Sequence, residues 1–61
     1  MIQLKNGYKL VFIPIGKESP MENHKGGELA VDEENKIIYG WELFAVTYGT
    51  DSIIKACEAY R

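Results

Sequence analysis

The chain has 61 residues, is 46% hydrophobic and 26% charged, and carries a formal net charge of −2 at pH 7. This length allows one domain, residues 1–61, which buries only about 60% of the surface of its unfolded chain. Its single cysteine, Cys57, excludes an internal disulfide, and with one histidine, His24, it falls short of the usual four zinc ligands. We therefore expect no metal and no cofactor, and we expect a homodimer, since association is a remaining way to stabilise so small a core.

Composition also excludes several classes of partner. No apolar run approaches the roughly 20 residues of a membrane span. The first residues lack the charged segment and long apolar run of a signal peptide. The acidic balance disfavours binding to phosphate backbones. We expect a cytoplasmic protein without a membrane or nucleic-acid partner, and a lone thiol fits that reducing compartment.

Residues 1–15 are predicted to form a β-hairpin. Asn6-Gly7 lies between two β-prone runs, and this dipeptide is the strongest short signal for a hairpin. A type I turn with a bulge at Gly7 would place Leu10 opposite Leu4, so that apolar side chains share one face.

A second hairpin is predicted within residues 28–48, after a loop at 16–27 that is rich in turn-forming residues. Its turn is the polar run at 32–35. Leu29 and Val31 alternate with polar or small residues, so we expect both to point into the core.

The stretch at 36–48 fits two structures. As a strand it is apolar on both faces, and its β-branched and aromatic residues favour this interpretation. Gly40 would then mark a bulge. As a helix it places apolar side chains on one stripe at positions i, i+4, i+7 and i+11, which are Ile37, Trp41, Phe44 and Tyr48.

Residues 51–60 are predicted to form a helix with Thr50 as its N-cap and Asp51 in the first turn. The predicted fold is therefore α+β. A small antiparallel sheet from two hairpins, at about 1–15 and 28–48, packs against one C-terminal helix at about 51–60.

No pattern of catalytic residues is present. General base chemistry by His24 would need a positioned neighbour, and the nearby Glu22 lies in the same predicted loop. Cys57 lies on the apolar stripe of the predicted helix, where buried thiols are inert. We therefore expect no enzymatic activity.

Seven aromatic side chains are many for so small a core. They can all fill the core, or some can lie in an interface, where Tyr, Trp and Phe are enriched. We favour a partner surface. Two alternatives remain, a sheet that stacks single-stranded nucleic acid on its rings and a structural homodimer whose seam is aromatic.

Two segments resemble a known family. Residues 44–55 contain Phe-x-Val-x-Tyr-Gly followed by Asp-x-Ile-Ile-Lys, and residues 22–26 read Glu-x-His-Lys-Gly. Both are similar to segments of the small phage-encoded inhibitors of uracil-DNA glycosylase. The resemblance implies a dimeric inhibitor that occupies the DNA-binding site of a host enzyme. It also implies a helix around Phe44 and a strand at Ile53-Ile54.

Under this resemblance Phe44 and Tyr48 would line an apolar pocket for the enzyme, and Glu22 would supply negative charge. Ala45 departs from the family, which has an acidic residue there. Combined with the aromatic surplus, the sequence predicts an inhibitor of a host enzyme or defence protein. The predicted partner-binding residues are Tyr39, Trp41, Phe44, Tyr48 and Glu22.

Overall fold

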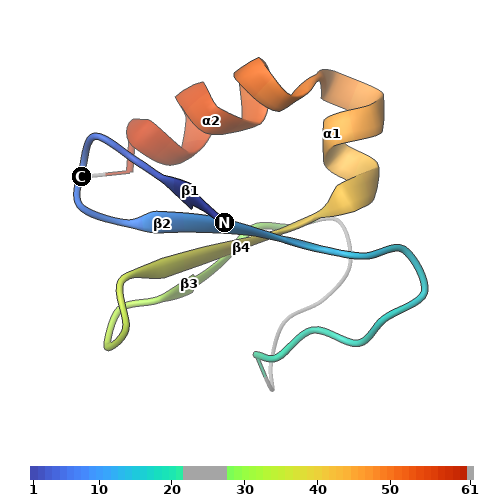
Figure 1. The fold of residues 1–61 in the computed structure, drawn as a ribbon, viewed down its shortest axis with the longest axis horizontal. Helices are drawn as coiled ribbons and strands as arrows, with labels where there is room; N and C mark the ends of the chain where they lie inside the picture. Colours follow the sequence, from blue (N-terminus) through green and yellow to red (C-terminus); the bar gives the residue numbers. More distant parts are fainter. Residues whose placement is uncertain (22–27, 61) are drawn as a thin grey trace.

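The computed structural model describes residues 1–21 and 28–60 as a four-stranded sheet with two helices on one side (Figure 1). The α+β prediction is confirmed. The elements in chain order are β1 (Ile2–Gln3), β2 (Lys9–Ile13), β3 (Ala30–Asp32), β4 (Ile37–Trp41), α1 (Glu42–Tyr48) and α2 (Thr50–Glu58).

The first hairpin joins β1 to β2. Gly7 has a φ of +89°, as the predicted bulge requires. The predicted register is wrong by two residues, because Leu10 pairs with Ile2 and not with Leu4. The turn has three residues, Lys5, Asn6 and Gly7, so the extra residue comes before Asn-Gly and not after it. Since the shift is an even number, every side chain keeps its predicted face.

The sheet is mixed, so the prediction of an antiparallel sheet is wrong. Its strand order is β1-β2-β4-β3, and the central strands β2 and β4 run parallel. A parallel pair needs a connection of about a dozen residues or more, and the chain from residue 14 to residue 29 is long enough to bring the second hairpin back in that direction. The β2–β4 register runs unbroken through Gly40, which excludes the predicted bulge there. A Cβ at this glycine would lie 3.1 Å from a side-chain carbon of Leu29, so close packing explains its small size.

The strand predicted to continue to residue 48 ends at Trp41, and α1 follows at once. The helical interpretation is therefore correct from Glu42 onward, and the carboxylate of this residue lies in the favourable first turn of α1. Gly49 ends α1 and is also the N-cap of α2, in place of the predicted Thr50. Its φ of +91° suits glycine, and it gives the sharp change of direction between the helices. The Ile53-Ile54 segment is helical, so the strand that the family resemblance implied there is absent.

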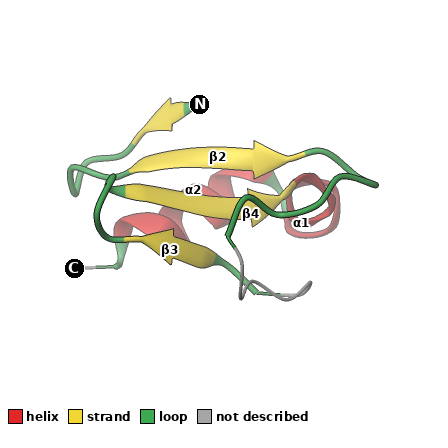
Figure 2. Ribbon diagram, turned by 90° about the horizontal axis from the view of Figure 1, so that it is seen from below, coloured by secondary structure: helices red, strands yellow, loops and turns green. Residues whose placement is uncertain are grey.

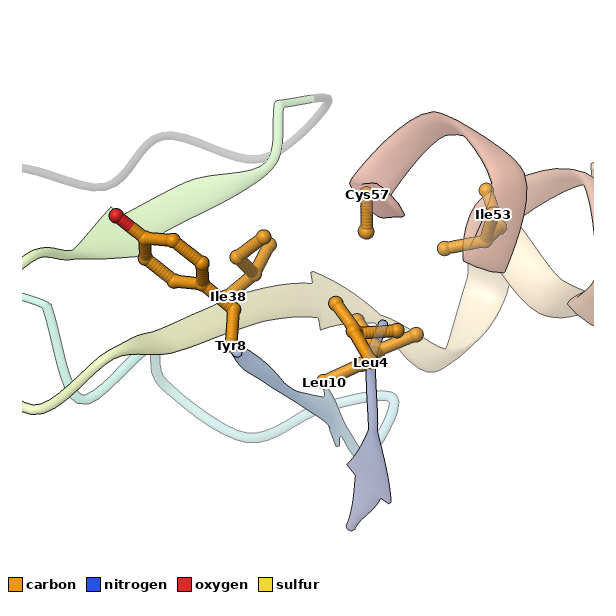
Figure 3. Packing of buried hydrophobic residues seen from close by; sticks show 6 residues of the cluster. All are labelled: Leu4, Tyr8, Leu10, Ile38, Ile53 and Cys57. Carbon is orange, nitrogen blue, oxygen red and sulfur yellow. The ribbon is translucent and has the colours of Figure 1, made fainter. Parts of the chain in front are cut away.

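The core lies between α2 and the sheet face that it covers (Figure 3). Leu29 and Val31 pack against this core, as predicted. Six buried side chains form its centre, Leu4, Tyr8, Leu10, Ile38, Ile53 and Cys57.

Asn6 joins the first hairpin to the end of α2. Its side-chain nitrogen donates hydrogen bonds to the carbonyl oxygens of Cys57, at 2.9 Å, and Tyr60, at 2.6 Å. Its side-chain oxygen accepts a bond of 3.1 Å from the backbone N–H of Tyr8. One amide thus orders the turn and binds two carbonyl oxygens at the C-terminal end of α2, of which that of Cys57 also accepts a bond from the backbone N–H of Tyr60.

Glu33, in the turn between β3 and β4, adds a second link to the same end of the molecule. Its carboxylate accepts hydrogen bonds from the hydroxyls of Tyr8, at 2.9 Å, and Tyr60. The two tyrosine rings meet edge to face with centroids 5.3 Å apart. The Lys36 ammonium lies 4.9 Å from the centroid of the Tyr8 ring. Two of the seven rings are therefore used to hold the fold together.

Candidate protein-binding surface

The structure separates the predicted partner-binding residues into two groups. Tyr39 and Trp41 lie on β4, and Phe44 and Tyr48 lie on α1. Glu22 lies outside the described residues. The four aromatic residues therefore do not form one continuous surface.

Tyr39 and Trp41 point to the sheet face opposite the helices. They alternate along β4 with Ile38, which belongs to the core under α2. Their partners on β2 are Val11 and Ile13, so the centre of this face is apolar. Figure 2 is seen from this side, with both helices behind the sheet.

Among the described residues, the sheet face opposite the helices has no exposed aromatic ring. Tyr39 and Trp41 are both partly buried, and Ile13 is buried. The chain that leaves β2 passes below the sheet and crosses the C-terminal end of β4 (Figures 1 and 2). Partial burial within the protein itself thus accounts for two of the seven aromatic rings, those of Tyr39 and Trp41.

Helix α1 presents a different surface, since none of its seven residues is buried. Leu43 is 53% exposed, Val46 73% and Tyr48 64%. The ring of Tyr48 meets the partly buried ring of Phe44 edge to face, with centroids 6.2 Å apart. We refer to Leu43, Phe44, Val46 and Tyr48 as the α1 surface.

The position of α1 explains this exposure. The helix starts where β4 ends, stands at one end of the sheet, and turns back at Gly49 into α2 (Figure 1). It therefore lies beside the core formed by α2 and not over it. A helix that is apolar on several sides is normally buried, so the α1 surface is suited to being covered by another molecule.

The charged residues of α1 and of the first turn of α2 have one sign. Between Ile37 and Ile54 the sequence contains two carboxylates, Glu42 and Asp51, and no lysine or arginine. Both carboxylates are exposed, one in the first turn of each helix. Each helix thus begins with a negative charge, which is favourable at the positive end of its dipole.

The titratable groups with shifted pKa values lie elsewhere. Burial, and secondarily the Glu58 carboxylate, raise the pKa of the Cys57 thiol, which leaves it protonated and hidden in the core. Hydrogen bonds from the Asn35 side chain and backbone lower the pKa of Asp32 in the β3–β4 turn. Neither shift places a reactive group beside α1.

Two further searches cover residues 1–21 and 28–60. No group of three or more His, Cys, Asp or Glu side chains there could hold a metal ion. The two helices found there are too short to cross a bilayer. His24, the candidate general base, lies outside these ranges.

Sequence reasoning missed Leu43 and Val46. As a strand, the stretch places them on two different faces, and as a helix it leaves both outside the stripe of Trp41, Phe44 and Tyr48. That position off the stripe was the available signal. Leu43 and Val46, outside that stripe, are themselves apolar, which is unusual for the solvent side of a surface helix.

Comparison of the chain with models of protein families, with curated proteins and with solved structures gives no match.

Proposed function

We propose that this chain is a non-enzymatic interaction protein that binds another protein through the α1 surface. The observation that carries this proposal is the exposure of Leu43, Val46 and Tyr48 on a helix with no buried residue. Leu43 and Val46 lie about 60° apart around α1 and so form one exposed apolar side, and exposed apolar patches are typical of protein-binding sites. Tyrosine is also a frequent hot-spot residue in such interfaces.

Inhibition of a host enzyme or defence protein in the cytoplasm is the specific form of this proposal. Its support is the resemblance around Phe44 and Tyr48, whose rings touch on successive turns of α1. Purified uracil-DNA glycosylase tests it directly. We expect a stoichiometric amount of the chain to stop excision of uracil from an oligonucleotide. An unchanged rate would remove this enzyme as the partner and leave the general proposal standing.

The general proposal is tested by affinity capture from cell extract with three proteins: the wild type, a Leu43→Glu/Val46→Glu double variant, and an Ala56→Glu control. All three substituted side chains are exposed, so each variant should keep the fold. We expect a stoichiometric partner with the wild type and the control, and loss of that partner with the double variant. The proposal fails if the wild type retains no partner, or if the double variant retains the same one.

Self-association is the second candidate, since a chain of 61 residues has a small core. The α1 surface would then be the interface of a structural homodimer. Light scattering after size exclusion distinguishes the two. A dimer that Val46→Glu converts to a monomer, together with no captured partner, would favour this candidate.

A further inference from the structure

We infer that Asn6 is a site of spontaneous modification, and that the fold suppresses the reaction for as long as the first hairpin stays attached to α2. The reaction is hydrolysis of the side-chain amide of Asn6 to a carboxylate, through a cyclic imide formed with the backbone nitrogen of Gly7. Its product lacks the N–H groups that join the hairpin to α2, so refolding does not restore the link.

The residue that follows Asn6 favours this chemistry. The nitrogen of Gly7 forms a bond to the side-chain carbon Cγ of Asn6, and the amide nitrogen leaves as ammonia with the proton that Gly7 gives up. Water then opens the imide at either carbonyl, which yields aspartate or its isomer, in which the main chain runs through the side chain. Glycine has no Cβ to hinder the attack and adopts backbone conformations that other residues avoid. Asparagine is also among the thermally labile residues.

In the folded chain the leaving group and the attacking group are both held by hydrogen bonds. The leaving nitrogen, Nδ2 of Asn6, donates to the carbonyl oxygens of Cys57, at 2.9 Å, and Tyr60, at 2.6 Å. The attacking nitrogen, that of Gly7, donates its proton to the carbonyl oxygen of Leu4 at 3.4 Å. Ring closure requires Nδ2 to depart and the Gly7 nitrogen to lose its proton, so the reaction breaks all three bonds.

Release of Nδ2 requires the hairpin and α2 to separate. Its two acceptors lie 51 and 54 residues further along the chain, at the end of α2. The same contact contains the core, because Leu4 and Tyr8 of the hairpin pack in one cluster with Cys57 of α2 (Figure 3). A domain of this size is open for at most about 1% of the time, so the reaction should be at least about 100-fold slower in the native chain than in the unfolded one.

The product weakens the contact that had protected its precursor. A carboxylate at Asn6 has no N–H to donate, and it adds a negative charge at the C-terminal end of α2, which is the negative end of the helix dipole. The Glu58 carboxylate already lies at this contact, where it accepts a hydrogen bond of 3.1 Å from the backbone N–H of Lys5. Each modified chain therefore opens more readily than the original, and the change accumulates in one direction.

Incubation of the full chain at mildly alkaline pH, in buffer and in guanidinium chloride, tests the site. Peptide mass spectrometry follows each asparagine over time, and Asn35 is the internal control because it is exposed and precedes Lys36. In guanidinium chloride Asn6 should convert faster than Asn35. In buffer its conversion should slow by at least about 100-fold, and by a larger factor than that of Asn35. If Asn6 reacts no faster than Asn35 when unfolded, the site is overturned, and equal rates of Asn6 with and without denaturant would overturn its protection.

A core variant and the isolated product test the two remaining steps. Ile53→Val removes one methyl group from the core and leaves the hydrogen bonds of Asn6 in place. It should raise the conversion rate in buffer about fivefold and leave the rate in guanidinium chloride unchanged. An unchanged rate in buffer would overturn the requirement for opening. The product, separated by ion exchange through its added charge, should unfold at a lower urea concentration than the wild type, as should Asn6→Asp. A product with the wild-type urea midpoint would overturn the loss of the link.

Discussion

Replacing Asn6 by alanine should remove the main polar link between the first hairpin and α2. The substitution deletes three hydrogen bonds, two to the carbonyl oxygens of Cys57 and Tyr60 and one from the N–H of Tyr8. Each bond contributes about 0.5–1.5 kcal/mol net. Because water can reach part of this site, we expect Asn6→Ala to lower the free energy of unfolding by about 2 kcal/mol.

That loss is large for this chain. At about 0.05–0.15 kcal/mol per residue, a domain of this length has a total stability of about 3–9 kcal/mol. Each kcal/mol shifts the midpoint of thermal unfolding by about 4–8 °C in a small domain, so the shift should reach about 8–16 °C. Urea unfolding, followed by the fluorescence of Trp41, measures the free energy, and circular dichroism measures the thermal midpoint.

Two further variants isolate the cause. Asn6→Asp keeps the acceptor for the N–H of Tyr8 but has no amide donors, and it places a negative charge at the negative end of α2. It should lose at least as much stability as Asn6→Ala. Asn35→Ala, at an exposed turn residue that bonds to Asp32, should lose less than about 1 kcal/mol. A loss below about 0.5 kcal/mol for Asn6→Ala would refute the stabilising link that Asn6 makes between the first hairpin and α2.

Three other predictions concern single groups. Gly7→Ala should lose about 1–2 kcal/mol through positive φ alone, since no atom lies within 4 Å of the added Cβ; an unchanged urea midpoint would contradict this. The lowered pKa of Asp32 stabilises the fold fully above its unfolded pKa of about 3.9, and this contribution disappears as pH falls through the lower folded-state pKa. The stability difference between wild type and Asp32→Asn should therefore shrink in acid, and NMR titration should place the Asp32 midpoint below that of an unfolded peptide. Cys57 should react with a thiol reagent more than about 100-fold more slowly in the native protein than in urea, because even about 3 kcal/mol of stability keeps the open form below 1%; equal rates would show that the thiol is accessible.

Local signals predicted the ends of the molecule well. Asn6-Gly7 marked the first turn, and the helix at the C-terminus runs over nearly the expected residues. Both depend on short-range chemistry, namely the backbone freedom of glycine and the apolar stripe of a helix. The strand pairing between β2 and β4 depends on contacts between distant residues, and nothing in either strand determines whether they run parallel.

The transition at Trp41 shows why the site was harder to predict. The composition of residues 37–48 favours a strand, and the spacing of their apolar side chains permits a helix. In the structure, Ile37–Trp41 form a strand and Glu42–Tyr48 form a helix. Where the sheet ends, backbone groups lose their strand partners, and a helix satisfies them within its own segment. The exposure of Leu43 and Val46 follows from the position of α1 beside the core, which is a property of the assembled fold.

The parallel pairing of the two central strands also has a consequence for how the chain reaches its native state. Each hairpin can form on its own within microseconds, but residues 9–13 and 37–41 meet only after a long segment closes. Ile53 and Cys57 of α2 then pack against a sheet face to which both hairpins contribute. During synthesis neither hairpin has a completed core until α2 has emerged, so we expect the chain to acquire its fold in one late cooperative step and not progressively from its N-terminus.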